Sequence, residues 1–78
     1  MSAAADRGTS DVVTVTVNGD ETAIAPGTTV ASLVAHLGLE PRGVAVAVDG
    51  EVVTRRTWDG RALAPGERVE VLTIAQGG

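Results

Sequence analysis

Two runs of alternating valines, each followed by a tight-turn dipeptide, constrain the fold of this chain more than any other feature. Residues 13–17 alternate valine with threonine and lead into Asn18-Gly19, and residues 44–48 alternate valine with alanine and lead into Asp49-Gly50. A period of two is typical of a half-buried strand. Asn-Gly and Asp-Gly favour two-residue hairpin loops because both positions tolerate positive φ. The sequence therefore predicts two β-hairpins, with return strands at residues 21–25 and 51–53.

One helix is predicted between the two hairpins. Its apolar positions recur at helical spacing and are Val30, Leu33, Val34 and Leu37. Thr28 or Thr29 can cap the N-terminus, and Gly38 suits the left-handed position that follows a helix end. A helix this short is not stable alone, so we expect its apolar face to lie on a sheet.

The last predicted strand covers residues 68–74, with Val69 and Val71 on one face. The first and last strands can lie side by side and parallel, because the intervening helix provides the crossover that a parallel pair needs. We therefore expect an α+β fold of the β-grasp (ubiquitin-like) type, a mixed sheet of four to five strands with one main helix packed on one face. The expected organisation is a disordered N-terminal extension at 1–10, the β-grasp domain at 11–74 and a flexible diglycine tail at 75–78.

The small size of the chain limits what it can enclose. A chain of 78 residues buries only about 60% of its unfolded surface, which favours a function at the surface or at a terminus over an internal catalytic cleft. The core is expected to consist mainly of valine, because Phe and Tyr are absent and Trp58 is the only aromatic residue. The supporting core residues are expected to be Ile24, Leu33, Leu37, Leu63 and Ile74.

Charge and composition exclude several classes of function. The net charge is −4 and all six basic residues are arginines, so nucleic-acid binding is not expected. The chain has no cysteine and no apolar run of the roughly 20 residues that span a bilayer, so we expect a cytoplasmic protein without membrane contact. His36 has no carboxylate or nucleophile at a useful spacing and is interpreted as a surface residue. We expect no catalytic residue, metal or bound cofactor, and any ATP must bind to a partner.

The chain ends in Gly77-Gly78. Glycine lacks a Cβ atom, so such an end can thread a narrow channel in any backbone conformation. The Gly78 carboxylate could attack the α-phosphate of a nucleotide to form an acyl adenylate, and sulfur could then displace AMP to leave a thiocarboxylate. Gly78 is therefore the candidate sulfur-carrying residue, and Gln76 and Gly77 are the residues that would thread into a partner.

The sequence resembles the ThiS family of sulfur carriers in thiazole (thiamin) biosynthesis from residue 12 to residue 78. The matching pieces are Val17-Asn18-Gly19, Gly27-Thr28-Thr29-Val30 with Leu33, Val46-Ala47-Val48-Asp49-Gly50-Glu51-Val52-Val53, Arg55 with Trp58, Pro65-Gly66-Glu67-Arg68-Val69-Glu70-Val71-Leu72-Thr73, and Ala75-Gln76-Gly77-Gly78. The chain departs from the family at Thr54 to Trp58, where Pro-Arg-Ser-Glu-Trp is common, and in its longer N-terminal extension.

The resemblance implies three protein partners. An E1-like adenylyltransferase would activate Gly78 with ATP, a cysteine desulfurase system would supply sulfur, and thiazole synthase would consume the thiocarboxylate. The chain itself would be a co-substrate of these enzymes rather than an enzyme.

Four residues are candidates for contact with a partner. If Val69 and Val71 face the helix, Leu72 and Ile74 lie on the opposite face of the sheet and form an apolar patch that leads to the tail. Trp58 is either a plug at the edge of the core or a partly exposed anchor for a partner. Arg55 is either a solvated charge or the partner of an acidic group.

Other functions remain open at this point. The small subunit of molybdopterin synthase and a carrier for cysteine synthesis share the same tail chemistry. A ubiquitin-like modifier would end as an amide on target lysines. A plain interaction module would have an inert tail.

Overall fold

The computed structural model describes residues 12–74. The elements run in the order β1 (Val13–Val17), β2 (Asp20–Ile24), α2 (Val30–His36), η1 (Pro41–Gly43), β3 (Val44–Val48), β4 (Glu51–Val53), η2 (Arg55–Gly60) and β5 (Arg68–Thr73). The two hairpins, the helix and the final strand are confirmed. The predicted extension at 1–10 and the predicted tail at 75–78 lie outside the described residues.

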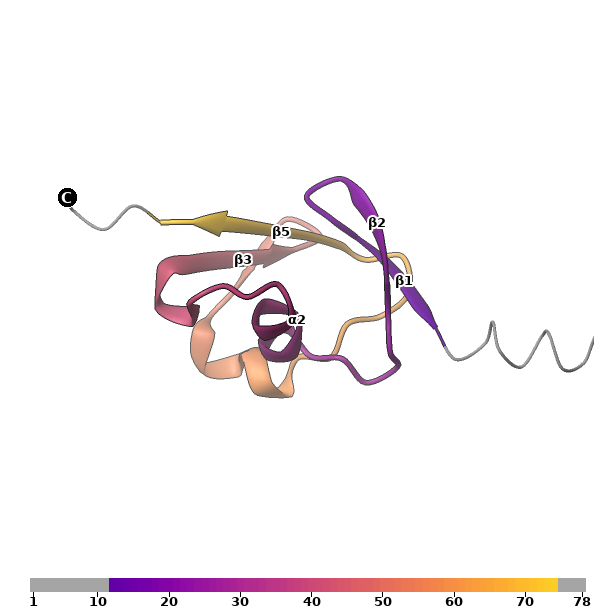
Figure 1. Ribbon diagram of the computed structural model, residues 1–78, viewed down its shortest axis with the longest axis horizontal. Coiled ribbons are helices and arrows are strands. Elements are labelled where there is room, and N and C mark those ends of the chain that lie inside the picture. Colours follow the sequence, from indigo (N-terminus) through magenta and orange to yellow (C-terminus); the bar gives the residue numbers. More distant parts are fainter. Residues whose placement is uncertain (1–11, 75–78) are drawn as a thin grey trace, which may run out of the picture.

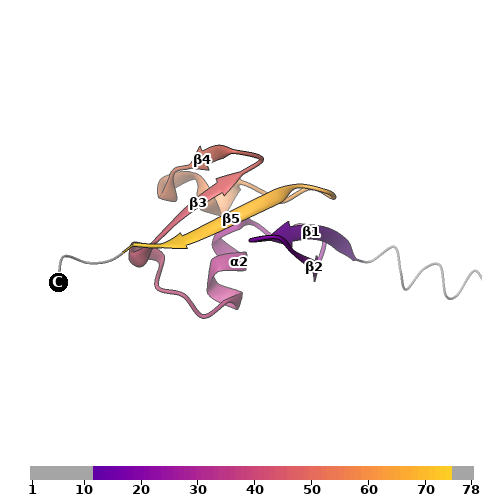
Figure 2. The same cartoon turned by 90° about the horizontal axis from the view of Figure 1, so that it is seen from above.

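The five strands form one mixed sheet in the order β2-β1-β5-β3-β4 (Figure 2). The last strand, β5, is central, parallel to β1 and antiparallel to β3. The helix α2 lies on one side of the sheet (Figure 1). This arrangement confirms the predicted β-grasp fold, and it places the strand that leads to the C-terminus in the middle of the sheet.

Both hairpin turns have the backbone that their sequences predict. Asn18 and Asp49 have φ values of 51°, and the glycines that follow them have φ values of 88° and 85°. Positive φ at both central positions twists the turn in the same sense as the strands. Because this loop has only two residues, β2 begins directly at Asp20, one residue earlier than predicted.

A capping box starts the helix. The Thr29 hydroxyl accepts a hydrogen bond from the Ser32 N–H, and the Ser32 hydroxyl accepts one from the Thr29 N–H. At the other end Gly38 takes a φ of 75°, its N–H donates to Ala35, and the Leu39 N–H donates to Val34. These two bonds form a Schellman motif, which ends the helix and turns the chain toward β3.

The core fills the space between α2 and the inner face of the sheet. Its buried residues are Val15, Val17, Val30, Leu33, Val34, Val44, Val46, Val48, Trp58, Leu63, Val69 and Val71. The expectation of a valine core is confirmed. The prediction that Leu37 and Ile74 belong to the core was wrong, since Leu37 is 40% exposed and Ile74 is 49% exposed. Leu37 is the C-cap residue after the last residue of α2, and Ile74 follows the end of β5.

Candidate functional site

The C-terminal end of β5 is held from both sides. On the β3 side, the Ile74 N–H donates to the Gly43 carbonyl over 2.7 Å. On the β1 side, the Asn18 side chain donates from Nδ2 to the Val71 carbonyl over 3.1 Å, and its Oδ1 accepts from the Val71 N–H over 2.9 Å. The Asn18 carboxamide therefore bonds to Val71 as a peptide group of a neighbouring strand does. This fixes the direction in which the chain leaves the sheet toward Gly78.

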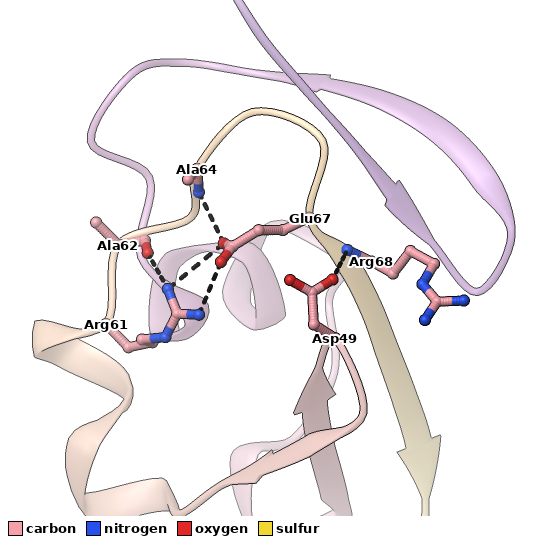
Figure 3. A network of polar contacts seen from close by, with 6 residues as sticks. All are labelled: Asp49, Arg61, Ala62, Ala64, Glu67 and Arg68. Atoms are coloured by element: carbon pink, nitrogen blue, oxygen red, sulfur yellow. Dashed lines mark hydrogen bonds and ion pairs between the residues drawn. The ribbon is translucent and has the colours of Figure 1, made fainter.

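The sequence analysis missed this role of Asn18 and treated it only as a turn residue. The only available signal was a difference between the two hairpin turns. The first position of the turn is asparagine in the first hairpin (Asn18) and aspartate in the second (Asp49). A carboxamide can donate and accept at once, whereas a carboxylate only accepts. Asp49 shows the difference, because its Oδ1 accepts a single bond from the Arg68 N–H (Figure 3).

The outer face of the sheet carries an apolar patch beside the end of β5, which we call the outer patch. It consists of Ala45, Ala47, Val52 and Leu72, which are neighbours in the register, and of Ile74, two residues beyond Leu72; the exposed Glu70, opposite Ala47, borders it. Leu72 is 66% exposed and Val52 is 75% exposed. Figure 2 looks onto this face, with α2 behind the sheet. Leu72 lies on the face opposite the buried Val69 and Val71, as predicted, and Ile74 is 49% exposed.

Arg55 lies close to the same end of the sheet. It lines an open surface hollow together with Glu40, Arg42 and Gly43, and Gly43 is the residue that accepts the Ile74 hydrogen bond. Two arginines and one glutamate therefore share a hollow with the residue that is hydrogen-bonded to Ile74. Arg42 was not among the residues singled out from the sequence.

Trp58 belongs to the core. Its side chain is 4% exposed, and its indole Nε1–H donates to the Val53 carbonyl over 2.9 Å. Two roles were considered for Trp58. The structure supports the first, a residue that fills the edge of the core, and the second, a partly exposed anchor for a partner, was wrong. Trp58 is the buried residue of η2, so it anchors on the core the segment that begins at Arg55.

The remaining candidate site residues, Gln76, Gly77 and Gly78, lie at the chain end and are outside the described residues.

Other kinds of site were also considered. His36 is exposed, as interpreted from the sequence. Within residues 12–74 no group of three His, Asp or Glu side chains could hold a metal ion, and no helix in that range is long and apolar enough to cross a bilayer.

A polar network fixes the turn that starts β5 (Figure 3). Arg61 and Glu67 form an ion pair of 2.9 Å, the Glu67 carboxylate accepts from the Ala64 N–H, and Arg61 donates to the Ala62 carbonyl. The hydrogen bond from Arg61, with the bond from Ala64 as a smaller contribution, lowers the pKa of Glu67 below its ordinary value of 4.5. The network closes the Pro65-Gly66 turn and sets the position of Arg68, the first residue of β5.

Glu67→Gln is expected to lower the free energy of unfolding at pH 7 by about 0.5–1 kcal/mol, because the pair is partly exposed and screened by water. A carboxylate with a lowered pKa stabilises the fold above the unfolded pKa, and this contribution is lost as the pH falls through the folded value. The difference between the two proteins should therefore shrink below about pH 4.5. Urea unfolding at pH 7 and pH 3 measures it. Glu70→Gln, an exposed change on the same strand, is the control, and a difference that stays constant with pH would contradict the ion-pair explanation.

The fold and the exposed C-terminal end of the central strand define a small ubiquitin-like β-grasp protein. A sequence model of the ThiS family matches residues 11–78, and the chain belongs to this family. Its structure is similar to the crystal structure of the thiamine biosynthesis protein (ThiS) from Geobacter metallireducens, with a TM-score of 0.73 and 30% identity over 85% of this chain and 100% of the other. The solution structure of a thiamine biosynthesis protein from the same organism gives a TM-score of 0.71 and 30% identity over 85% of this chain and 88% of the other.

A computationally designed protein based on human erythrocytic ubiquitin shares the fold alone, with a TM-score of 0.51 and 18% identity over 87% of this chain and 96% of the other. No curated protein sequence matches this chain. The resemblance to the ThiS family that the sequence motifs indicated is confirmed.

Proposed function

We propose that this protein is a sulfur carrier that acts with the enzymes of thiamin biosynthesis and carries sulfur as a thiocarboxylate on Gly78 for thiazole formation. Membership of the ThiS family supports this proposal. The observation that carries it is the position of Gly77-Gly78, which follows three residues after the central strand of the sheet. The protein acts as a co-substrate, and its reactive group is the C-terminal carboxylate.

The chemistry proceeds in two steps on the partner enzymes. In the first, a carboxylate oxygen of Gly78 attacks the α-phosphorus of ATP bound to an E1-like adenylyltransferase, and pyrophosphate leaves. In the second, hydrosulfide attacks the acyl carbon, AMP leaves and one proton is released, which yields the thiocarboxylate. A persulfide from a cysteine desulfurase system delivers the same sulfur through an acyl disulfide, which a thiol then reduces. Thiazole synthase consumes the product.

The described part of the chain supplies the docking surface in this proposal. The outer patch presents Leu72 and Ile74 beside the exit of the tail, and Arg55 adds a positive charge at the same end. An apolar centre with a charged rim is the usual composition of a protein–protein interface. Trp58 contributes only by supporting the segment that carries Arg55.

Leu72→Glu is expected to weaken binding to the adenylyltransferase by about tenfold or more, because a charge replaces an apolar side chain at the centre of the proposed interface. The fold should be retained, since Leu72 is 66% exposed. Thr14→Glu, an exposed change on β1, is the matched control and should bind like the wild type. Titration calorimetry measures both, and equal affinities for the two variants would remove the outer patch from the proposal.

The proposed function is tested by intact-mass spectrometry of the full chain incubated with ATP, the adenylyltransferase of the same organism and sulfide. The expected result is a mass increase that corresponds to replacement of one oxygen by sulfur, located at Gly78 by fragmentation. No increase, with the enzyme shown to be active on a known carrier, would contradict the carrier function and favour a modifier or an inert interaction module.

A second experiment separates the pathways. The thiocarboxylate is offered to thiazole synthase and, in parallel, to the large subunit of molybdopterin synthase. We expect sulfur transfer with the first, and transfer with the second alone would assign the protein to molybdopterin synthesis.

A further inference from the structure

One edge of β5 is only partly covered. On the β3 side, pairing extends from Val69 to Thr73, opposite Val48 to Val44. On the β1 side, pairing stops earlier, at Val17 opposite Val69. The chain turns away from β5 at Asn18, so β5 extends past the end of its parallel neighbour.

The Asn18 side chain covers the next position of this edge. Its carboxamide bonds to both the N–H and the C=O of Val71. Along a strand, successive peptide groups point alternately to the two neighbours, and the Ile74 N–H points to β3. The Thr73 N–H and C=O therefore point to the β1 side, where no strand of residues 12–74 faces them.

An open groove runs along this uncovered edge. The apolar residues Val17, Leu37, Leu39 and Leu72 line it, together with Thr73 and the acidic Asp20. Leu37 is 40% exposed although its place in the helical pattern predicts burial. The edge thus combines a free peptide group with an apolar surface next to it, which are the two requirements for adding a strand.

We propose that the adenylating partner adds an extended segment to this edge of β5 and pairs with the backbone of Thr73, in the position that β1 has vacated. The inference rests on the proposed function. The segment carries an apolar residue over Leu37 and Leu39 and a basic residue near Asp20.

The length of the tail favours this occupant. Four residues follow Ile74, and they span at most about 13–14 Å when extended. A protein that acts on the Gly78 carboxylate must therefore contact the domain within that distance of Ile74, which is where the free edge lies. Pairing at Thr73 also fixes the direction of the tail before it enters the partner. A second copy of this chain is disfavoured, since each copy has a net charge of −4 and brings an Asp20 to the groove.

Amide hydrogen exchange of Thr73 tests the pairing directly. In the free protein the Thr73 N–H should exchange rapidly, while the Ile74 N–H, bonded to Gly43, exchanges slowly. In the complex with the adenylyltransferase and ATP, the Thr73 N–H should become protected. Protection already present in the free protein, from a second copy or another segment of this chain, would overturn the proposal.

A pair of variants tests its effect on activation. Thr73→Pro removes the N–H, which no described residue accepts, and Thr73→Val keeps the N–H while it removes the hydroxyl. We expect Thr73→Pro to raise the KM for the adenylyltransferase by about tenfold or more and Thr73→Val to leave it close to the wild type. The melting temperature and the amide chemical shifts check that the Thr73→Pro variant is folded. The hydrogen-exchange measurement uses the wild-type protein, so it tests the pairing even if this variant does not fold.

The outcomes separate the inference from the proposed function. If Thr73→Pro is activated like the wild type and the Thr73 N–H stays unprotected in the complex, strand addition is wrong and the carrier function stands. If the wild type gains no sulfur with an enzyme that is active on a known carrier, the proposed function fails and the inference fails with it.

Discussion

Deletion of Gly78 is expected to reduce thiocarboxylate formation to less than about 1% of the wild type and to leave the melting temperature unchanged. The deletion moves the terminal carboxylate back by one residue, about 3.3–3.6 Å in an extended chain. A misplacement of about 1 Å at a reacting centre can already lower a rate by about 100-fold. The buried core lies entirely between Val15 and Val71, so the fold should not depend on the last residue. Intact-mass spectrometry and thermal unfolding measure the two effects.

Gly78→Ala is the companion variant. It keeps the carboxylate at the same distance from the sheet and adds one methyl group beside it, so activation should fall by less than in the deletion. A deletion variant that keeps more than a tenth of the activity would show that the partner does not require the carboxylate at this distance. A large loss of thermal stability in either variant would show that the tail packs on the domain.

Leu33→Ala is expected to lower the free energy of unfolding by about 2–5 kcal/mol, because it removes a large buried side chain and leaves a cavity between α2 and the sheet. Leu33 is 1% exposed and belongs to the largest fully buried side chains. A domain of this size has a total stability of only about 4–12 kcal/mol, so the variant should be close to unfolding. Urea denaturation should show a lower midpoint.

The matched control for this variant is Leu37→Ala. The two leucines are four residues apart on the predicted apolar face, but Leu37 is 40% exposed at the end of the helix. Its substitution should cost clearly less than that of Leu33, since Leu37 is already 40% exposed in the folded protein and leaves no closed cavity. Equal losses for both leucines would contradict the position of the helix on the sheet.

The comparison of Leu33 with Leu37 shows what the sequence can predict about this fold. Periodicity and turn residues are local signals, and they predicted both hairpins, the helix and the parallel arrangement of the first and last strands. The sequence does not say where the sheet ends beneath the helix, so Leu37 was placed in the core. Ile74 was counted with the core because it is apolar, although the alternation along the last strand also placed it on the opposite face, and the sequence did not decide between the two.

The candidate site depended even more on contacts between distant residues. Asn18 and Val71 are separated by 53 positions, and no local pattern connects a turn residue with the end of the last strand. The role of Trp58 also needed the structure, because a single aromatic residue fits a core and an interface equally well. The polar residues Arg61 and Glu67 gave no signal because their pairing depends on the shape of the turn between them.

The central position of β5 has a mechanical consequence. In the proposed function a partner draws the C-terminus into a narrow channel, and the pulling force would then enter the domain at Ile74 and pass to β3 on one side and to β1 on the other. The hydrogen bonds of both ladders run across the direction of the force, so they are loaded together in shear instead of opening one after another from an end. We therefore expect the domain to stay folded when a force is applied to its C-terminus.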